Sequence, residues 1–315
     1  MSIIHYEHAI HAVDNHYLRP NFDASHIIIE QGRAAIVDCG TSHSVPRILS
    51  ALEALGVARE AVDWLLITHV HLDHAGGAGQ LMQALPNARA VLHPRGAPHM
   101  IDPAKLIAAS RAVYGDAVYE KLYGEILPID AARVHATSEG ENIALAGRNF
   151  QVLHTPGHAM HHHVFFDEQS RGVFTGDTFG LSYREFDVDG RAFAFPTTTP
   201  TQFDPDQLID SIQRIMGLEP VAAYLTHYGR ITGLSRIAES LIRMINDFAH
   251  LAREQSGQPD GEARRLVREG IHDVLRGELA RHGCTLPEAV VDEVLELDLD
   301  LNTDGLLAWL ARART

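Results

Sequence analysis

The sequence predicts an α/β protein in which two β-sheets stack face to face, with helices outside them and a helical C-terminal region. Short β-branched runs alternate with segments of helical periodicity over residues 26–93, as in other α/β proteins. A second group of short runs, each bounded by turn residues, lies over residues 149–175. From Leu234 onward apolar residues recur every three or four positions, which is the period of amphipathic helices.

The first group of elements opens with a hairpin, because Gln31-Gly32-Arg33 separates two β-branched runs at residues 26–30 and 34–38. A helix follows at residues 44–55, where the apolar side chains fall on one face. The next elements are a strand, a helix, a strand and a largely helical excursion, at residues 62–68, 80–85, 90–93 and 94–125. This alternation of strand and helix is typical of α/β architecture.

The second group of elements contains strands at residues 149–154, 164–167 and 172–175. A long loop rich in aromatic residues then runs from Thr178 to Pro205. The remaining elements are a helix, a strand and three amphipathic helices, at residues 205–216, 221–226, 234–251, 262–279 and 286–297.

The composition excludes several classes of protein. The chain has 315 residues, of which 45% are hydrophobic, so it can bury a substantial core. Its formal net charge of −15 provides no basic footprint, which argues against a nucleic-acid partner. Cys39 and Cys284 are too few for a disulfide framework, and residues 1–16 lack the apolar core of a signal peptide. We expect a cytoplasmic protein with a small-molecule substrate and no membrane or nucleic-acid partner.

The stretch Thr68-His69-Val70-His71-Leu72-Asp73-His74-Ala75-Gly76-Gly77 carries the strongest chemical signal. It follows the strand predicted at residues 62–68, so its polar side chains lie on a loop where they can converge on one point. Three imidazoles and a carboxylate suit zinc, iron or manganese, and the absence of nearby thiolates argues against a structural cysteine site. The sequence therefore predicts a metal site at the end of this strand.

Three further polar residues follow strands in the same way. They are His158 in Thr155-Pro156-Gly157-His158, Asp177 in Thr175-Gly176-Asp177-Thr178 and His227 in Leu225-Thr226-His227-Tyr228-Gly229. Together with the first stretch and the Asp38-Cys39-Gly40 turn, these motifs resemble in order and flanking residues the five-motif pattern of the metallo-β-lactamase superfamily. The resemblance covers about Asp38 to His227 and implies a four-layer αβ/βα sandwich. The helical periodicity after Leu234 lies outside it, so we expect a catalytic domain over residues 1–232 and a helical extension over residues 233–315 packing on it.

The resemblance also implies a dinuclear metal centre. His69, His71 and His158 would hold one metal, Asp73, His74 and His227 the other, and Asp177 would bridge them. Two divalent ions held close together need anionic ligands between them, which a carboxylate and a bridging hydroxide supply. Zinc is the expected metal, with iron or manganese also compatible. Asp38 is expected to orient a ligand from outside the ligand shell, with a plain turn-forming role as the alternative.

Within that superfamily the motifs resemble the branch of glyoxalase II-type thioesterases and lactonases. We therefore expect a dinuclear metal-dependent hydrolase that attacks a thioester, ester or lactone with a metal-bridging hydroxide. Asp73 would also shuttle a proton, and the Tyr183 phenol could donate to the developing oxyanion, although a packed loop tyrosine is the alternative. Arg184 and Tyr228 are further candidates for contacts with substrate.

Two other enzymatic activities remain open. Two roles also remain open for the C-terminal helices that begin at Leu234. An iron-dependent oxidoreductase of the same fold, similar to persulfide dioxygenases, would use the first metal site only, so Asp73, His74 and His227 argue against it. A phosphodiesterase or nuclease is disfavoured by the net charge of −15. The amphipathic helices from Leu234 onward fit cover on the sandwich or the interface of a homodimer.

Overall fold

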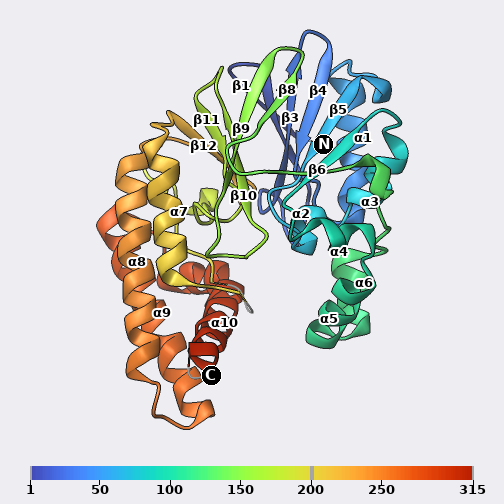
Figure 1. The fold of residues 1–315 in the computed structure, drawn as a ribbon. Helices are drawn as coiled ribbons and strands as arrows, with labels where there is room; N and C mark the ends of the chain where they lie inside the picture. Colours follow the sequence, from blue (N-terminus) through green and yellow to red (C-terminus); the bar gives the residue numbers. More distant parts are fainter. Residues whose placement is uncertain (1, 199–201, 314–315) are drawn as a thin grey trace. The chain divides into compact units, whose positions relative to one another are not determined.

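The structure is a computed structural model of the chain and describes residues 2–198 and 202–313. The chain forms two compact units (Figure 1). Unit 1 consists of Met1–His154, His161–Gly176 and Pro220–Arg230. Unit 2 consists of Thr155–Met160, Asp177–Glu219 and Ile231–Thr315.

The first sheet of unit 1 has seven strands in the order β1-β2-β3-β4-β5-β6-β7. Their bounds are Ile3–Tyr6, Ile10–Asp14, Ala24–Glu30, Arg33–Val37, Val62–Leu66, Arg89–Leu92 and Val134–Ala136. The strands from β1 to β4 pair antiparallel, whereas those from β4 to β7 pair parallel. The parallel strands end at the same edge, and the Thr68–Gly77 stretch leaves β5 there.

The second sheet has the order β13-β12-β11-β10-β9-β8. In chain order the strands β8 to β13 span Asn142–Leu145, Arg148–His154, His163–Asp167, Gly172–Phe174, Ala222–Leu225 and Gly229–Ile231. Strands β8 to β11 pair antiparallel and β11 pairs parallel with β12. Because β12 runs parallel to β11, the residues that follow both strands lie at one end of this sheet.

The two sheets pack face to face on a shared apolar core. Ile28, Val37 and Leu66 of the first sheet belong to the same buried cluster as Phe165 and Phe174 of the second. The opposite face of the first sheet packs on helices α1 (Val45–Ala54) and α3 (Ala78–Ala84). Alternate residues of a strand point to opposite faces, so Ile36 lies in the helix-facing cluster while its neighbour Val37 lies between the sheets.

The remaining helices of unit 1 are short. They are α2, α4, α5 and α6, over Leu72–Ala75, Ala97–Ile101, Ala104–Tyr114 and Asp116–Tyr123. Tyr119 and Tyr123 of α6 pack in one buried cluster with Leu72, the first residue of α2. This cluster joins α6 to α2, the helix that contains Asp73 and His74.

The helices of unit 2 are α7 (Pro205–Gly217), α8 (Leu234–Glu254), α9 (Asp260–His282) and α10 (Glu288–Ala313). Helix α8 packs against α7, α9 and α10 (Figure 1). Its buried residues recur every three or four positions along the chain, as the sequence pattern predicts. None of the helices in the described part of the chain is long and apolar enough to cross a membrane.

The predicted fold class is confirmed, because two mixed sheets stack face to face and helices complete the C-terminal region. The structure adds β1, β2, β7, β8 and β13, which the sequence pattern did not reveal. The last helix is also longer than the predicted 286–297. Residues 199–201 of the predicted long loop and residues 314–315 of the predicted extension lie outside the described residues. The domain boundary at residue 232 stays a prediction.

Candidate metal centre

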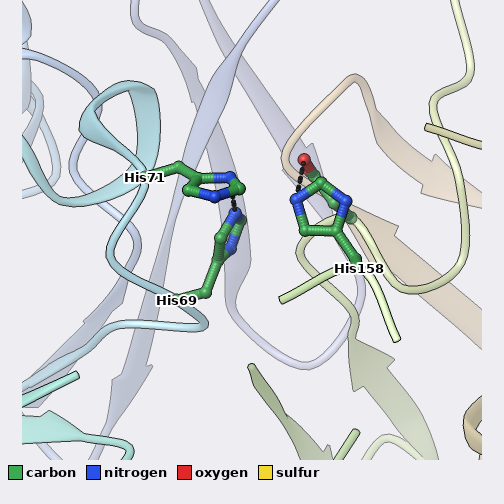
Figure 2. A group of neighbouring side chains, drawn as sticks. His69, His71 and His158 are labelled. Carbon is green, nitrogen blue, oxygen red and sulfur yellow. Dashed lines mark hydrogen bonds and ion pairs between the residues drawn. The ribbon is translucent and has the colours of Figure 1, made fainter. Parts of the chain in front are cut away.

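Two predicted ligands leave the end of β5 together. His69 is buried, and its Nε2 lies 2.9 Å from Nδ1 of His71. Figure 2 shows the two rings turned toward one another, with His71 on the loop that leads into α2. The sequence places both imidazoles in one turn because the strand ends at Leu66 and the helix begins at Leu72.

A second set of predicted ligands converges within unit 1. Asp73, His74 and His227 each offer one ligand atom, and these atoms lie within 4.8 Å of one another. Oδ2 of Asp73 is 3.5 Å from Nε2 of His227 and 4.0 Å from Nε2 of His74. Asp73 and His74 come from α2, whereas His227 follows β12 of the other sheet. The sandwich therefore brings together residues that are far apart in sequence.

In His74 and His227, the ring nitrogen that points away from Asp73 is hydrogen-bonded to an oxygen. Nδ1 of His227 lies 2.8 Å from the Phe22 carbonyl oxygen, and Nδ1 of His74 lies 2.9 Å from Oδ2 of Asp38. A carbonyl or carboxylate oxygen can only accept, so each Nδ1 carries the proton. In the neutral imidazole, Nε2 then presents a lone pair toward Asp73. Several acceptor atoms thus face one another, and a bound cation would satisfy all of them.

Asp38 connects three of the ligand-bearing segments. Its buried carboxylate accepts hydrogen bonds from the Thr68 amide at 2.8 Å, the Thr68 hydroxyl at 2.8 Å and the Thr226 hydroxyl at 2.7 Å, in addition to His74. Because the Thr68 hydroxyl gives its hydrogen to Asp38, its oxygen accepts from Nδ1 of His69 at 3.2 Å. Asp38 is thus the acceptor that holds the His74 ring, and its predicted role in orienting a metal ligand stays a prediction.

The other two predicted ligands belong to unit 2 and show the same pattern. Nε2 of His158 lies 3.4 Å from Oδ2 of Asp177, and its Nδ1 lies 3.3 Å from the Thr197 carbonyl oxygen. Figure 2 shows the His158 ring. The carbonyl fixes the proton on Nδ1, so in the neutral ring the Nε2 lone pair faces the carboxylate. This pair of facing acceptors also fits a cation.

The turn before His158 is fixed by helix α7. The Gly157 carbonyl accepts from the Asp204 amide at 2.7 Å, and the Pro156 carbonyl accepts from the Ser211 hydroxyl at 2.6 Å. Gly157 has φ of +130°, and a Cβ at this position would lie 2.2 Å from the amide nitrogen of Leu208. Only glycine combines this backbone angle with such a close approach, which explains the glycine of the Thr155–His158 motif.

The three candidates for substrate contact have well-defined surroundings. The fully buried Tyr183 hydroxyl donates to both carboxylate oxygens of Asp298, at 3.0 and 3.1 Å. Arg184 donates to the Ser182 carbonyl at 2.8 Å, and Tyr228 is buried in a small cluster of unit 1. Their roles toward substrate stay predictions.

Several residues that shape the centre carry no sequence signal that we recognised. The carbonyl groups of Phe22 and Thr197 contribute through the backbone alone, whereas Thr226 could have been found as the residue preceding His227. Asp23 was also missed. It is fully buried, and this burial raises its pKa to about 7, while His227 and His74 act in the opposite direction.

The sandwich, together with converging histidine and aspartate side chains that could hold metal ions, is typical of a metallo-hydrolase fold family. Residues 19–227 match the model of the metallo-beta-lactamase superfamily, and the chain therefore belongs to that superfamily. This match confirms the resemblance seen in the motifs and includes every predicted metal ligand.

Two curated relatives illustrate the range of similarity. The chain is 25% identical over 266 residues to a metallo-beta-lactamase fold-containing protein of Sulfurisphaera tokodaii, a match that covers 82% of this chain and 91% of the relative. It is 32% identical over 203 residues to a hydroxyacylglutathione hydrolase of Xanthomonas euvesicatoria. That second match covers 63% of this chain and only 58% of the hydrolase.

Solved structures show the same fold. An archaeal metallo-beta-lactamase superfamily protein from Sulfolobus tokodaii has a TM-score of 0.66 at 21% identity, covering 95% of this chain and 98% of the other. A metallo-beta-lactamase family protein from Thermus thermophilus has a TM-score of 0.67 at 20% identity, covering 97% and 94%.

Proposed function

We propose that the protein is a dinuclear metal-dependent hydrolase that acts on a small carbonyl compound, namely a thioester, an ester or a lactone. The observation that carries this proposal is the arrangement of His74 and His227, whose Nδ1 atoms are held by oxygens while their Nε2 atoms turn toward Asp73. Such preset imidazoles are typical of metal ligands. A solely structural site would be closed and rich in cysteine.

The proposed ligand sets follow the motif order of the superfamily. His69, His71 and His158 would hold one ion, Asp73, His74 and His227 would hold the other, and Asp177 would contribute its carboxylate to both. The support for this assignment is the match of the family model, the hydrogen bonds that orient the rings and the convergence of the second set within 4.8 Å. Zinc is the proposed metal, because imidazole and carboxylate ligands without thiolates suit it.

When bound, two divalent ions supply a hydroxide nucleophile at neutral pH and a Lewis acid for the carbonyl oxygen. Asp73 is the proposed proton shuttle. Its side chain is 25% exposed, whereas those of His74 and His227 are 0% and 4% exposed, so Asp73 is the member of this set that reaches solvent. A partly exposed carboxylate can take up a proton and pass it to the leaving group or to water.

A thioester is the first substrate class to test. Relatives named hydroxyacylglutathione hydrolase support it, at 30% to 32% identity. One of these matches, to the Xanthomonas oryzae protein, covers 83% of this chain and 81% of the relative. Identity at this level leaves the acyl group and the thiol carrier open, so esters and lactones belong in the same experiment.

The experiment combines metal analysis of the purified protein with a substrate panel of a hydroxyacyl thioester, an ester, a lactone and a phosphodiester. We expect about two divalent ions per chain and turnover of at least one carbonyl substrate. About one iron per chain, with no hydrolysis across the panel, would overturn the proposal and favour the oxidoreductase alternative.

Two matched pairs of variants locate the site. Asp177→Ala and His227→Ala are expected to abolish turnover and to lower the metal content. Their controls are Asp116→Ala, whose side chain is 81% exposed, and His250→Ala, whose side chain is 71% exposed. Full activity of Asp177→Ala would mean that the site lies elsewhere.

A further inference from the structure

We propose that Asn302 of helix α10 is a positioning residue for the metal ligand His158, acting through the backbone of residues 196–198. The inference rests on the proposed function, because it assumes that His158 binds metal. Asn302, Thr197 and His158 all belong to unit 2, so their contacts lie within one compact part of the chain.

The Asn302 side chain is 1% exposed and holds the loop on both sides of Thr197. Its Oδ1 accepts from the Thr198 amide at 2.6 Å and from the Thr198 hydroxyl at 2.9 Å. Its Nδ2 donates to the Pro196 carbonyl at 3.3 Å. The Thr198 hydroxyl lies 2.9 Å from the Asn302 carbonyl as well. One buried amide therefore fixes the residue before Thr197 and the residue after it.

Thr197 is the residue whose carbonyl oxygen accepts from Nδ1 of His158 at 3.3 Å. The direction of this carbonyl decides which nitrogen of His158 carries the proton and how the ring is turned. Because residues 196 and 198 are both bonded to Asn302, rotation of the Thr197 peptide would break at least one of these hydrogen bonds. Asn302 thereby transmits the position of α10 to His158.

An asparagine is chemically suited to this position. The task needs an acceptor for the Thr198 amide and a donor for the Pro196 carbonyl, and a side-chain amide has both. Aspartate would keep the acceptor and lose the donor, while alanine would lose both. The aspartate and alanine variants therefore distinguish the contribution of the acceptor for Thr198 from that of the donor to Pro196.

The experiment measures metal affinity by titration against a chromophoric zinc chelator, using the full-length protein. Asn302→Ala is expected to weaken the binding of one of the two zinc ions by about 10-fold, the lower end of the range for partners outside the ligand shell. The other ion is expected to bind as in the wild type. Asn302→Asp is expected to retain more affinity than Asn302→Ala, because it keeps the acceptor for Thr198.

The matched control is Thr303→Val, which alters the neighbouring buried residue of α10. The Thr303 hydroxyl donates to the Leu299 carbonyl within the same helix, so its loss is expected to lower stability without a change in zinc affinity. Absorption spectra of the cobalt-substituted proteins provide a second readout, since a shift of the d–d bands reports a changed ligand geometry at the metal.

The outcomes separate this inference from the proposed function. A wild-type protein that binds no metal overturns the proposed function itself. A wild-type protein that binds two zinc ions, together with Asn302→Ala that binds both with unchanged affinity, overturns the positioning role alone. If Asn302→Ala does not fold, Asn302→Asp takes its place, and wild-type affinity and spectra in that variant overturn the role.

Discussion

The Thr226 hydroxyl donates a 2.7 Å hydrogen bond to the Asp38 carboxylate, which connects the end of β12 with the end of β4 across 188 positions of sequence. The same carboxylate accepts from Thr68 and His74. One buried anion therefore holds the residue before His69, the ring of His74 and the residue before His227. The two sheets are joined at this point, directly behind the proposed metal ligands.

Replacement of Asp38 by asparagine is expected to damage stability and metal binding together. Hydrogen bonds to a charged group contribute about 1.5 to 3 kcal/mol each, so we expect the free energy of unfolding to fall by about 3 kcal/mol or more. Urea unfolding of the metal-free protein and metal analysis measure the two effects. The control is Asp63→Asn, which removes a partly exposed partner of Arg33 and is expected to change stability by less than about 1 kcal/mol. Two bound metals and an unchanged unfolding midpoint in Asp38→Asn would contradict this role.

His26 is expected to make stability depend on pH. It lies in β3 at 1% exposure beside Phe174 and Tyr224, and burial lowers its pKa to about 4, although Asp38 acts in the opposite direction. The unfolded chain, with an ordinary histidine pKa of 6.5, binds more protons between these values, so stability falls as pH drops from 6.5 toward 4. The loss from this residue is about 3 kcal/mol, by the conversion of about 1.4 kcal/mol per pKa unit.

The measurement is the free energy of unfolding of metal-free protein at several pH values. His26→Leu is expected to show a shallower loss of stability between pH 6.5 and 4 than the wild type. His250→Gln, at an exposed position, is expected to follow the wild-type curve. Parallel curves for His26→Leu and the wild type would show that another group causes the pH dependence.

Loss of one partner from the buried ion pair of Arg148 and Asp167 is expected to lower the stability of the protein more than loss of both partners. Nε and Nη2 of Arg148 lie 3.0 and 2.5 Å from the two carboxylate oxygens, and both side chains are 0% exposed. Arg148→Met would leave a buried charge without its partner, at a cost of about 3 to 5 kcal/mol. The double variant Arg148→Met with Asp167→Asn is expected to recover part of that loss in urea unfolding. A double variant less stable than Arg148→Met would refute this account.

Tyr183→Phe separates two roles for the tyrosine. Its hydroxyl donates to the buried Asp298, so removal of the oxygen is expected to reduce the free energy of unfolding by about 1 to 3 kcal/mol. A donor to a developing oxyanion would instead lower kcat by about 10² to 10³ with a smaller effect on stability. Steady-state kinetics and thermal unfolding of the same variant decide between them. We expect the effect on stability to dominate, because the side chain is fully buried.

Sequence patterns predicted the elements with clear periodicity and missed those without it. The hairpin of β1 and β2 has a tight turn at His8 and Ala9, with φ of +59° and +51°. Glycine, asparagine or aspartate is the usual sign of such a turn, so two other residues conceal it. Residues 234–251 were predicted as a helix because their apolar face is continuous, and α8 covers that range.

The sequence predicted those parts of the candidate site that consist of side chains. His69, Asp73 and His227 stand in recognisable motifs, and the sandwich brings Asp73 and His227 to 3.5 Å. The groups that orient the rings were harder to predict, since a backbone carbonyl such as that of Phe22 leaves no trace in the residue type. Asn302 lies 144 positions after His158 and outside the range matched by the family, so its link to the ligand required the fold.

The carbonyl oxygens behind His158 and His227 have an evolutionary consequence. Every amino acid supplies a main-chain carbonyl, so these two hydrogen bonds place no demand on the residue types at positions 22 and 197. The buried Phe22 ring is constrained separately, because it packs edge-on against His227. Selection for the site is then expected to act on the residues that shape the backbone path, and Asn302 is one of them. Libraries that randomise position 197 should therefore yield more active members than libraries that randomise position 302, whose side chain makes the contacts.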